Sequence, residues 1–371
     1  MVPTSCRVAL LSEFGSLNGG EHSLLALIPE IRARGFEPVA LAPAKGRLAA
    51  ALAEHRIPHV AFSMRDDRTT AVERLADAFD RTAATLLHAN SLSMGRLSGR
   101  LAQATGHPTT THLRDILNLS NAAIADLNAN RRLLAVSQAT RNHHVAAGLD
   151  ARRTLVVYNG VDPNRFRRRQ TGRGWLRREL GISRPSLLVA TIGQLGLRKA
   201  LDVLAEATVQ VSATVDYLVI GERYSKKDES VVFEADAFER FLEAAPTGRL
   251  HRLGYRTDIA GILSEIDLLV HPARQEPLGR VLLEAAVSGC AILATDVGGT
   301  AEILVDNETA LLVAPDDAGA LAGGIDRLAG DESLRKRLGT AAREDVATRF
   351  TIEAAADGLT AAWEAALQSE P

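Results

Sequence analysis

Short apolar runs alternate along this chain with longer stretches whose apolar residues recur at helical spacing. Residues 7–11 (RVALL) have the length and composition of a buried strand, and residues 20–34 place leucines and isoleucines on one helical face. The alternation continues to residue 161 and begins again near residue 186. Strands of about five residues that are joined through helices form parallel sheets covered on both faces. The pattern therefore predicts an α/β protein with two doubly wound sheets.

A segment rich in Arg, Gly and Pro separates the two series of strands and helices. We expect a Rossmann-like domain over 1–165, a linker over 166–185 with one short helix (WLRREL), and a second Rossmann-like domain over 186–351. Ligands of doubly wound sheets bind outside the carboxyl ends of the strands. The predicted binding site is therefore a central cleft that both domains face.

Composition and charge narrow the class of protein. Of the 371 residues, 46% are hydrophobic and 24% are charged, as in an average soluble protein. A formal net charge of −2 and an aromatic share of 4% argue against a nucleic-acid partner. Two cysteines are too few for a disulfide scaffold or a thiolate zinc site. The sequence has neither a signal-peptide pattern nor 18 consecutive apolar residues, so we expect a cytoplasmic protein.

Arginines gather in residues 152–184, which contain ten of them against two acidic residues. One interpretation is a solvated surface segment. The other is a patch for an anionic substrate or for anionic lipid, which would make the protein peripheral at the inner face of the membrane. The sequence leaves both interpretations open.

The densest chemical signal is HPARQEPLGRVLLEAAVSGCAILATDVGG, residues 271–299. Seven residues separate Glu276 from Glu284, and Gly279 stands at the predicted start of a helix, where backbone N–H groups and the helix dipole attract anions. Glu284 is placed to accept hydrogen bonds from a cis-diol such as ribose, and Glu276 to reach the hydroxyls of a second sugar. The N–H groups expected to face the anion belong to Leu278, Gly279 and Arg280.

This segment resembles the E-x(7)-E motif of retaining glycosyltransferases of the GT-B fold, especially family 4, the glycosyl transferases group 1. The similarity extends to the segments GGEHSLLALIPEIRARGFEPVALAP, LLAVSQATRNHHVAAG with VVYNGVDPNRF, TIGQLGLRKALDVLAEA and TAEILVDNETALLVAPDD. It implies the GT-B architecture of two Rossmann-like domains that face a cleft. It also implies that the final helix, about 352–371, completes the first domain.

The resemblance implies that the second domain binds a nucleotide-sugar donor. Lys199, six residues after Gly193, is then expected on the donor diphosphate, where a cation stabilises the leaving group. Many relatives have an arginine directly after this glycine, whereas this chain has Gln194. We expect the neighbouring Arg198 to supply the second positive charge. Tyr255 lies in the loop that holds the nucleotide base in relatives.

In the first domain the resemblance implies a site for the hydroxyl acceptor. Gly19 and Gly20, between the first strand and the first helix, are expected to bind the donor, because glycines let the backbone approach a phosphate or sugar closely. These glycines do not have the G-x-G-x-x-G spacing, which disfavours a dinucleotide dehydrogenase. Relatives carry His-Asp after the fifth strand, whereas this chain has Arg114-Asp115 with His112 two residues earlier. Either His112 or Arg114 is expected at the reaction centre, and the sequence does not decide between them.

The function implied is retaining transfer of a sugar from a UDP-, GDP- or ADP-linked donor to a hydroxyl acceptor, which is a sugar, a lipid-linked glycan or a small molecule. No Asp-x-Asp motif follows a strand, so no metal ligands and no cofactor are expected. A non-catalytic nucleotide-sugar-binding protein and an epimerase or hydrolase of the same fold stay open as alternatives. His88, Asn90 and His271 also stand at predicted strand ends, where a structural role and a role in the site are both open.

Overall fold

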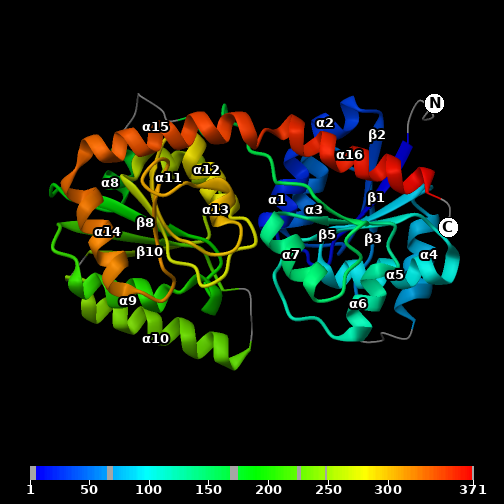
Figure 1. Cartoon of the computed structure of the whole chain (residues 1–371), viewed down its shortest axis with the longest axis horizontal. Helices are drawn as coiled ribbons and strands as arrows, with labels where there is room; N and C mark the ends of the chain where they lie inside the picture. Colours follow the sequence, from blue (N-terminus) through cyan, green and yellow to red (C-terminus); the bar gives the residue numbers. More distant parts are fainter. Residues whose placement is uncertain (1–5, 65–69, 168–173, 224–226, 247–248, 370–371) are drawn as a thin grey trace. The chain divides into compact units, whose positions relative to one another are not determined.

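The computed structural model describes residues 6–64, 70–167, 174–223, 227–246 and 249–369. The chain forms two compact units: unit 1 comprises Met1–Gly160 and Phe350–Pro371, and unit 2 comprises Val161–Arg349. Each unit has its own parallel β-sheet covered by helices (Figure 1). The predicted α/β fold with two doubly wound sheets is confirmed.

Within the described part of unit 1, the sheet has seven parallel strands in the order β3-β2-β1-β4-β5-β6-β7. The strands are β1 (Cys6–Leu11), β2 (Phe36–Ala42), β3 (His59–Ala61), β4 (Leu86–Ala89), β5 (Thr109–Leu113), β6 (Arg132–Ala135) and β7 (Thr154–Val156). The helices are α1 (Gly19–Ala26), α2 (Ile28–Ala33), α3 (Arg47–Glu54), α4 (Ala71–Asp80), α5 (Leu92–Thr105), α6 (Asn121–Asn128), α7 (Gln138–Ala146) and α16 (Ile352–Gln368). The order of the strands reverses between β1 and β4.

The described residues of unit 2 form a sheet of six parallel strands in the order β10-β9-β8-β11-β12-β13. The strands are β8 (Leu187–Ile192), β9 (Val215–Ile220), β10 (Leu250–Gly254), β11 (Leu268–His271), β12 (Ala291–Thr295) and β13 (Leu311–Val313). The helices are α8 (Trp175–Glu179), η1 (Leu197–Lys199, 3-10), α9 (Leu201–Gln210), α10 (Asp228–Ala244), α11 (Ile259–Glu265), α12 (Arg280–Ser288), α13 (Thr300–Ile303), α14 (Ala318–Gly330) and α15 (Glu332–Arg349). Here the reversal lies between β8 and β11.

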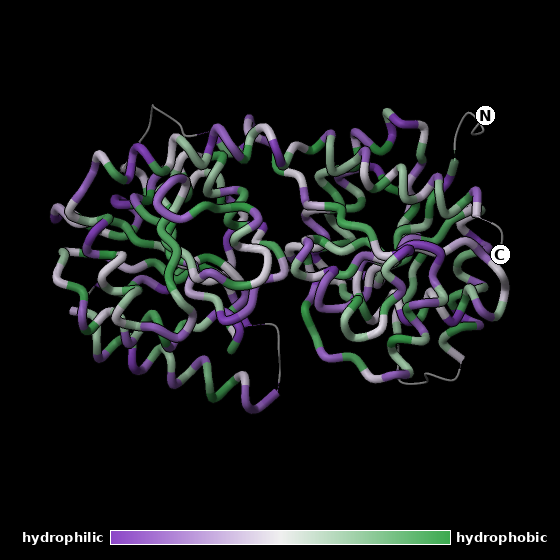
Figure 2. The backbone as a smooth tube through the Cα atoms, in the orientation of Figure 1, coloured by the Kyte–Doolittle hydropathy of each residue, from purple (hydrophilic) through white to green (hydrophobic). Residues whose placement is uncertain are grey.

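The cores of the two units explain the apolar runs of the sequence. All residues of β4, β5, β9, β11 and β12 are buried, because helices cover both faces of each sheet. Hydrophobic segments accordingly gather in the interior of each unit (Figure 2). The packing of these strands holds the loops at their carboxyl ends in place.

The helix predicted over 20–34 is two helices in the structure. α1 ends at Ala26, and α2 begins at Ile28 with Pro29 in its first turn. A proline in the middle of one continuous helix would lose a hydrogen bond and clash with the carbonyl four residues earlier. At the start of a new helix Pro29 causes neither problem, so one helix ends before Pro29 and a second one begins.

The segment predicted as a linker, 166–185, lies in unit 2 as far as the structure describes it. The N–H of Gly174 donates to the Glu265 carboxylate at 2.6 Å, and α8 packs against α11, a helix that the sequence analysis missed. Arg177 on α8 donates to the carbonyl of Ser186 and pairs with Asp267. These contacts attach α8 to the sheet of unit 2, whereas 168–173 lie outside the described residues.

The last helix, α16, packs on the sheet of unit 1, although the chain reaches it from α15 in unit 2. Thr351 caps its first turn by accepting a hydrogen bond from the Ala354 N–H. Trp363 is fully buried, with its ring 5.4 Å from Phe36 and 5.4 Å from His88, both in edge-to-face geometry. This aromatic contact anchors the end of the chain to unit 1.

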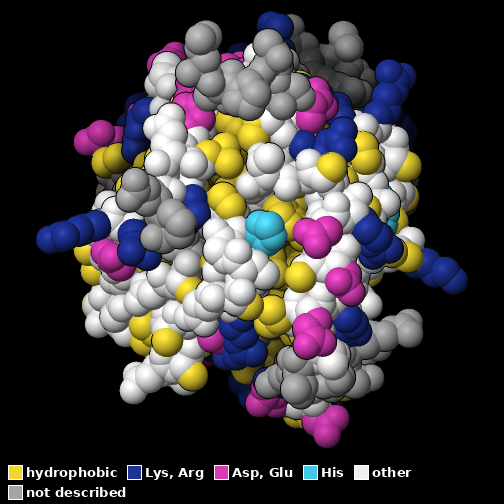
Figure 3. All heavy atoms as spheres, turned by 90° about the vertical axis from the view of Figure 1, so that its right-hand side faces the viewer, with side chains coloured by type: hydrophobic (Ala, Val, Ile, Leu, Met, Phe, Trp, Pro, Cys, Tyr) yellow, Lys and Arg dark blue, Asp and Glu magenta, His cyan; other side chains and the backbone are white. Residues whose placement is uncertain are grey.

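The surface of unit 1 carries both signs of charge. Figure 3 shows one of its faces, on which Lys or Arg and Asp or Glu side chains are interspersed. The visible face thus lacks the continuous basic stripe that nucleic-acid-binding domains present. Among the described helices of the chain, none is long and apolar enough to span a bilayer.

Replacing Trp363 by alanine tests the anchoring role of α16. Trp363→Ala should lower the free energy of unfolding of unit 1 by about 3–5 kcal/mol, because it empties a core position. Urea unfolding followed by circular dichroism measures the loss. Trp175→Ala, which truncates a half-buried residue on α8 of unit 2, is the control and should leave the unfolding transition of unit 1 unchanged. A loss below about 1 kcal/mol for Trp363→Ala would contradict the anchoring role.

Candidate functional site

Unit 2 carries its chemistry where the order of its strands reverses. β8 and β11 are neighbours in the sheet although they are far apart in the chain. The connections that leave their carboxyl ends diverge, and such a switch point is the usual ligand site of a doubly wound sheet. The connection after β11 contains Glu276 and leads into α12. The connection after β8 contains four of the predicted residues: Gly193, Gln194, Arg198 and Lys199.

The two connections meet at the carboxylate of Glu276, which is almost completely buried. Its Oε2 atom accepts hydrogen bonds from Lys199 Nζ and, at 2.8 Å, from His271 Nε2. Lys199 Nζ and His271 Nε2 lie 3.5 Å apart. Two donors, one from the loop after β8 and one from the end of β11, therefore share one oxygen, whereas Oε1 has no hydrogen bond to a described residue. The structure thus brings together Lys199 and Glu276.

The protonation states of this cluster follow from its charges. Burial alone would raise the pKa of Glu276, but the Lys199 cation and the His271 hydrogen bond outweigh burial and hold the pKa well below its usual value. Burial and the nearby cation of Lys199 both lower the pKa of His271, against the opposing effect of Glu276. At neutral pH Glu276 is therefore an anion and His271 is neutral, with its proton on Nε2.

Lys199 reaches Glu276 across the loop that follows β8. Its Cε atom would lie 3.6 Å from a Cβ atom at Gly193, so the lysine side chain runs alongside this glycine. Arg198 lies half-buried on the same 3-10 helix, and its carbonyl accepts a hydrogen bond from the N–H of Arg274. The predicted pair of cations thus stands on η1, and both residues are half-buried.

The start of α12 lies next to this cluster in the chain. Gly279 precedes the first turn with a φ of 100°, and a Cβ atom there would lie 2.6 Å from Leu282. Glycine is therefore required at this position, as the loop turns sharply into the helix. Arg280 begins α12 and its guanidinium pairs with Glu284 at 2.6 Å. Leu278, which precedes Gly279, is buried, so only its backbone can face a ligand.

Glu284 is buried one turn into α12. Burial raises the pKa of Glu284, and the positive charges of Arg280 and Arg165 oppose that rise. The Glu284 carboxylate is thus partly desolvated, and the ion pair with Arg280 stabilises its negative charge. Tyr255, the predicted base contact, follows β10 at the edge of the sheet, whereas the Glu276 cluster follows β8 and β11.

In unit 1 the predicted residues form a buried network of their own. His112 Nδ1 lies 3.3 Å from Arg114 Nη2 and 2.9 Å from His88 Nε2. Arginine can only donate, so His112 Nδ1 is the acceptor and the ring carries its proton on Nε2. His88 then donates from Nε2, and its Nδ1 accepts from the Thr110 hydroxyl at 2.8 Å. The structure thus brings His112 and Arg114 together rather than selecting one of them.

Arg114 is held by unit 1 on several sides. Its Nε donates to Asn90 at 2.9 Å and its Nη1 to Asn159 at 3.0 Å. A Cβ atom at Gly20 would lie 2.8 Å from Arg114 Cδ, so this glycine makes room for the arginine. A Cβ atom at Gly19 would have no neighbouring atom within 4 Å. Gly20 therefore has a packing role that the sequence analysis did not foresee.

The histidine pair is buried in its neutral form. Burial, assisted by the Arg114 cation, lowers the pKa of His88 to about 3. Burial, Arg114 and His88 together lower the pKa of His112 well below its usual value. Both imidazoles thus act as neutral hydrogen-bonding groups in the range where free histidine would be charged.

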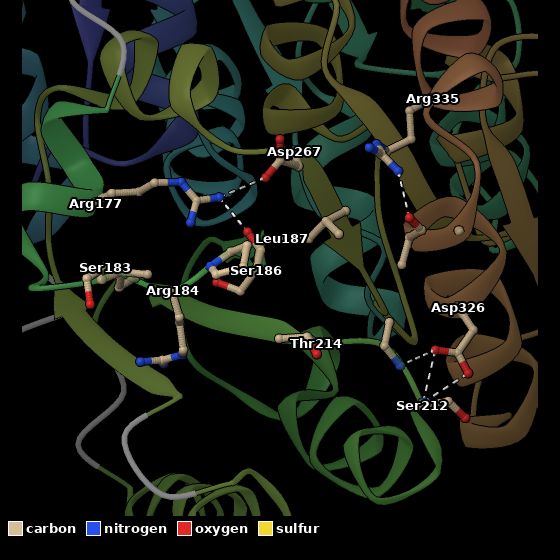
Figure 4. Close-up of a pocket in the computed structure, with 15 residues that line it drawn as sticks. Arg177, Ser183, Arg184, Ser186, Leu187, Ser212, Thr214, Asp267, Asp326 and Arg335 are labelled. Atoms are coloured by element: carbon tan, nitrogen blue, oxygen red, sulfur yellow. Dashed lines mark hydrogen bonds and ion pairs between the residues drawn. The ribbon is translucent and has the colours of Figure 1, made fainter.

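A pocket of about 1000 Å³ lies on the opposite edge of the unit 2 sheet, at the amino ends of β8, β9 and β11 (Figure 4). Arg177 and Asp267 pair with each other on its wall, and Asp326 accepts the N–H groups of Ser212 and Ala213. None of the residues predicted for the site lines it. Because these charged groups are engaged within the protein, the pocket gives no indication of its ligand.

His271 is the functional residue whose place in the site the sequence analysis left open. It ends an apolar strand, DLLVH, five residues before Glu276. A polar residue at that end of a buried parallel strand points to the switch-point crevice once the strand order is known. The sequence contains that signal, but the contact with Lys199 depends on the folded loop after β8.

The neutral histidine pair predicts a particular pH dependence. The pKa of His88 is lower in the folded than in the unfolded chain, so the unfolded chain binds the proton first as pH falls below about 6.5. Stability is therefore lost on acidification, and His88→Gln should lose about 2 kcal/mol less than the parent between pH 7.5 and 5.0.

Urea unfolding in a Trp175→Phe background, followed by Trp363 fluorescence, measures this difference for unit 1. His55→Gln, at a partly exposed position in the same unit, is the control for replacing a histidine of unit 1 by glutamine. Equal losses in His88→Gln and the parent would show that His88 is not held neutral.

Comparison with protein families adds an independent finding. Residues 175–345 match the family model described as Glycosyl transferases group 1, and residues 17–165 match Glycosyltransferase Family 4. The lipopolysaccharide core biosynthesis mannosyltransferase LpsB of Rhizobium meliloti (strain 1021) is 28% identical over 231 residues, 60% of this chain and 64% of LpsB. A D-inositol 3-phosphate glycosyltransferase of Nocardia farcinica (strain IFM 10152) is 30% identical over 252 residues, 64% of this chain and 53% of that protein. The chain thus spans about half to two thirds of the length of these curated relatives.

Solved structures share the fold. Anabaena HepE in complex with UDP and glucose has a TM-score of 0.87 at 22% identity, covering 96% of this chain and 99% of HepE. Sucrose-phosphate synthase from Thermosynechococcus elongatus has a TM-score of 0.80 at 19% identity, covering 97% and 98% of the two chains. At these identities the likeness shows the GT-B fold, as predicted. Together the two family models match most of the chain, and the fold agrees with them. The chain therefore belongs to the family 4 glycosyltransferases, the glycosyl transferases group 1.

Proposed function

We propose that the chain is a retaining glycosyltransferase that moves a sugar from a nucleoside diphosphate sugar to a hydroxyl acceptor without a metal ion. The observation that carries the proposal is the cluster of Lys199, His271 and Glu276 beside the start of α12, at the switch point of unit 2. A buried anion next to a lysine and a helix N-terminus offers adjacent sites for hydroxyls and for phosphate.

The donor would extend along the carboxyl edge of unit 2. The N–H groups at the start of α12 and the ammonium of Lys199 would hold the diphosphate. Arg198 would be the second cation, because this chain has Gln194 where many relatives have an arginine. Glu284 would accept the ribose hydroxyls, and the backbone near Tyr255 would hold the base. Oε1 of Glu276, which has no hydrogen bond to a described residue, would accept a hydroxyl of the transferred sugar.

The chemistry needs stabilisation of the leaving group above all. As the bond between the anomeric carbon and the diphosphate oxygen breaks, negative charge grows on the diphosphate, where Lys199 and the α12 N–H groups stabilise it. The acceptor oxygen bonds to the anomeric carbon on the same face, and its proton leaves with the nucleoside diphosphate. The Glu276 anion positions the sugar and stabilises positive charge at the anomeric carbon.

The proposal also covers the donor base, the acceptor and the location of the enzyme in the cell. Anabaena HepE has been solved with UDP, with UDP and glucose, and with UDP-glucose, which puts UDP-sugars first among the donors to test. Unit 1 would hold the acceptor outside the carboxyl ends of its strands. The enzyme would act in the cytoplasm, where nucleotide sugars are available.

A donor panel tests the proposal. Thermal unfolding is measured with UDP, GDP, ADP and their sugar conjugates, with EDTA present, because a ligand that binds only the folded chain raises its melting temperature. We expect one base to give a clear shift and its sugar conjugate to support transfer to an acceptor. A shift without any transfer would favour a non-catalytic binder, and sugar release or a changed sugar without acceptor would favour a hydrolase or epimerase.

Glu276 is the second test. Glu276→Gln keeps the shape of the side chain but removes its charge, so we expect kcat to fall by about 100-fold or more, with the affinity for the nucleoside diphosphate changed less than about threefold. Steady-state kinetics and calorimetric titration with the nucleotide measure the two quantities. Turnover near that of the parent would remove Glu276 from the mechanism.

A further inference from the structure

His271 donates a hydrogen bond to Glu276, and the proposed function gives this hydrogen bond no role. It is the last residue of β11, is 1% exposed, and donates from Nε2 to Glu276 at 2.8 Å. Its carbonyl faces the Thr295 hydroxyl on the neighbouring strand. The imidazole is therefore held by the sheet itself, whereas Lys199 approaches from a loop.

When a donor binds, Lys199 can interact with two anions, Glu276 and the donor diphosphate. In the structure its ammonium forms an ion pair with Glu276. In the proposed complex the same ammonium faces the diphosphate, whose charge is larger than that of a single carboxylate. Each hydrogen bond that Lys199 gives to the diphosphate weakens its hold on Glu276, which is buried and would then lack a strong partner.

We propose that His271 is a positioning residue that holds Glu276 in place, through its Nε2–H, while Lys199 transfers its ammonium from Glu276 to the donor diphosphate. The inference rests on the proposed function and deepens it. Because His271 and Lys199 share Oε2, the oxygen Oε1 keeps its orientation toward the sugar when the lysine departs. The neutral imidazole suits this role, since it donates one hydrogen bond without adding a charge that would compete for the diphosphate.

Two substitutions separate positioning from packing. His271→Leu removes the donor and keeps an apolar side chain in the core, whereas His271→Gln can place an amide N–H near the position of Nε2. We expect His271→Leu to lower kcat by about tenfold or more and His271→Gln to recover to within about threefold of the parent. The melting temperatures of both variants show whether they fold.

Binding measurements supply a readout that packing alone does not move. The nucleoside diphosphate does not reach Glu276, but its sugar conjugate does, so the ratio of their Kd values reports on the sugar contact. His271→Leu should lose most of the added affinity of the sugar conjugate and keep the affinity for the diphosphate within about threefold. His271→Gln should restore the ratio.

The pH profile adds a second readout. The charged groups that act on His271 are Lys199, Arg198 and Glu276. Loss of the Nε2–H donor removes one of the interactions that lower the pKa of Glu276, so the acid limb of kcat/KM should move to higher pH in His271→Leu. In His271→Gln the limb should return toward that of the parent.

Failure of this inference is distinguishable from failure of the proposed function. Nitrogen NMR of the ¹⁵N-histidine-labelled parent reports the tautomer of His271 with and without nucleotide and needs no turnover. A proton on Nε2 that persists when the nucleotide binds supports the inference, and a proton on Nδ1 overturns it. Equal losses in His271→Leu and His271→Gln, or wild-type ratios of Kd in His271→Leu, also overturn it, whereas absence of transfer in the parent overturns the proposed function.

Discussion

A carboxylate in the interior of a protein stays ionised only if cations and hydrogen-bond donors meet it, and Glu276 has both. Lys199 comes from the loop after β8 and His271 from the end of β11, so the cluster exists only because these two strands are neighbours in the sheet. Their adjacency is a product of the strand order β10-β9-β8-β11-β12-β13. The site therefore depends on the topology of unit 2, and the ion pair that it creates joins two connections of the chain.

The two units use buried polar groups in different ways. In unit 1 the chain of Thr110, His88 and His112 is neutral, and its single cation, Arg114, is held by asparagines. In unit 2 the buried carboxylate of Glu276 is charged, and the lysine that balances it stands on a short 3-10 helix. A neutral network keeps one arrangement, whereas an ion pair can exchange partners when a stronger anion arrives. This contrast supports the proposal that the donor binds in unit 2, where the ion pair can respond to it.

Local pattern was sufficient to predict much of the fold. The apolar runs of the strands and the spacing of Glu276, Glu284 and Lys199 are visible in the sequence because each reflects an element or loop of its own. Contacts between distant segments were not visible. The docking of α8 through Gly174 and Glu265, the room that Gly20 leaves for Arg114, and the shared oxygen between Lys199 and His271 all depend on tertiary neighbours. The break at Pro29 was available from the sequence but was outweighed by the regular apolar spacing around it.

The proposed mechanism depends on Lys199 leaving Glu276 for a diphosphate at the start of α12. The most direct measurement is a crystal structure of the chain with the nucleoside diphosphate that stabilises it most. We expect the diphosphate against the first turn of α12, Lys199 Nζ within hydrogen-bonding distance of it, and the hydrogen bond from His271 to Glu276 unchanged. A diphosphate bound in the pocket at the amino edge of the sheet, or an unchanged pair of Lys199 and Glu276 beside a bound nucleotide, would contradict the proposed mechanism.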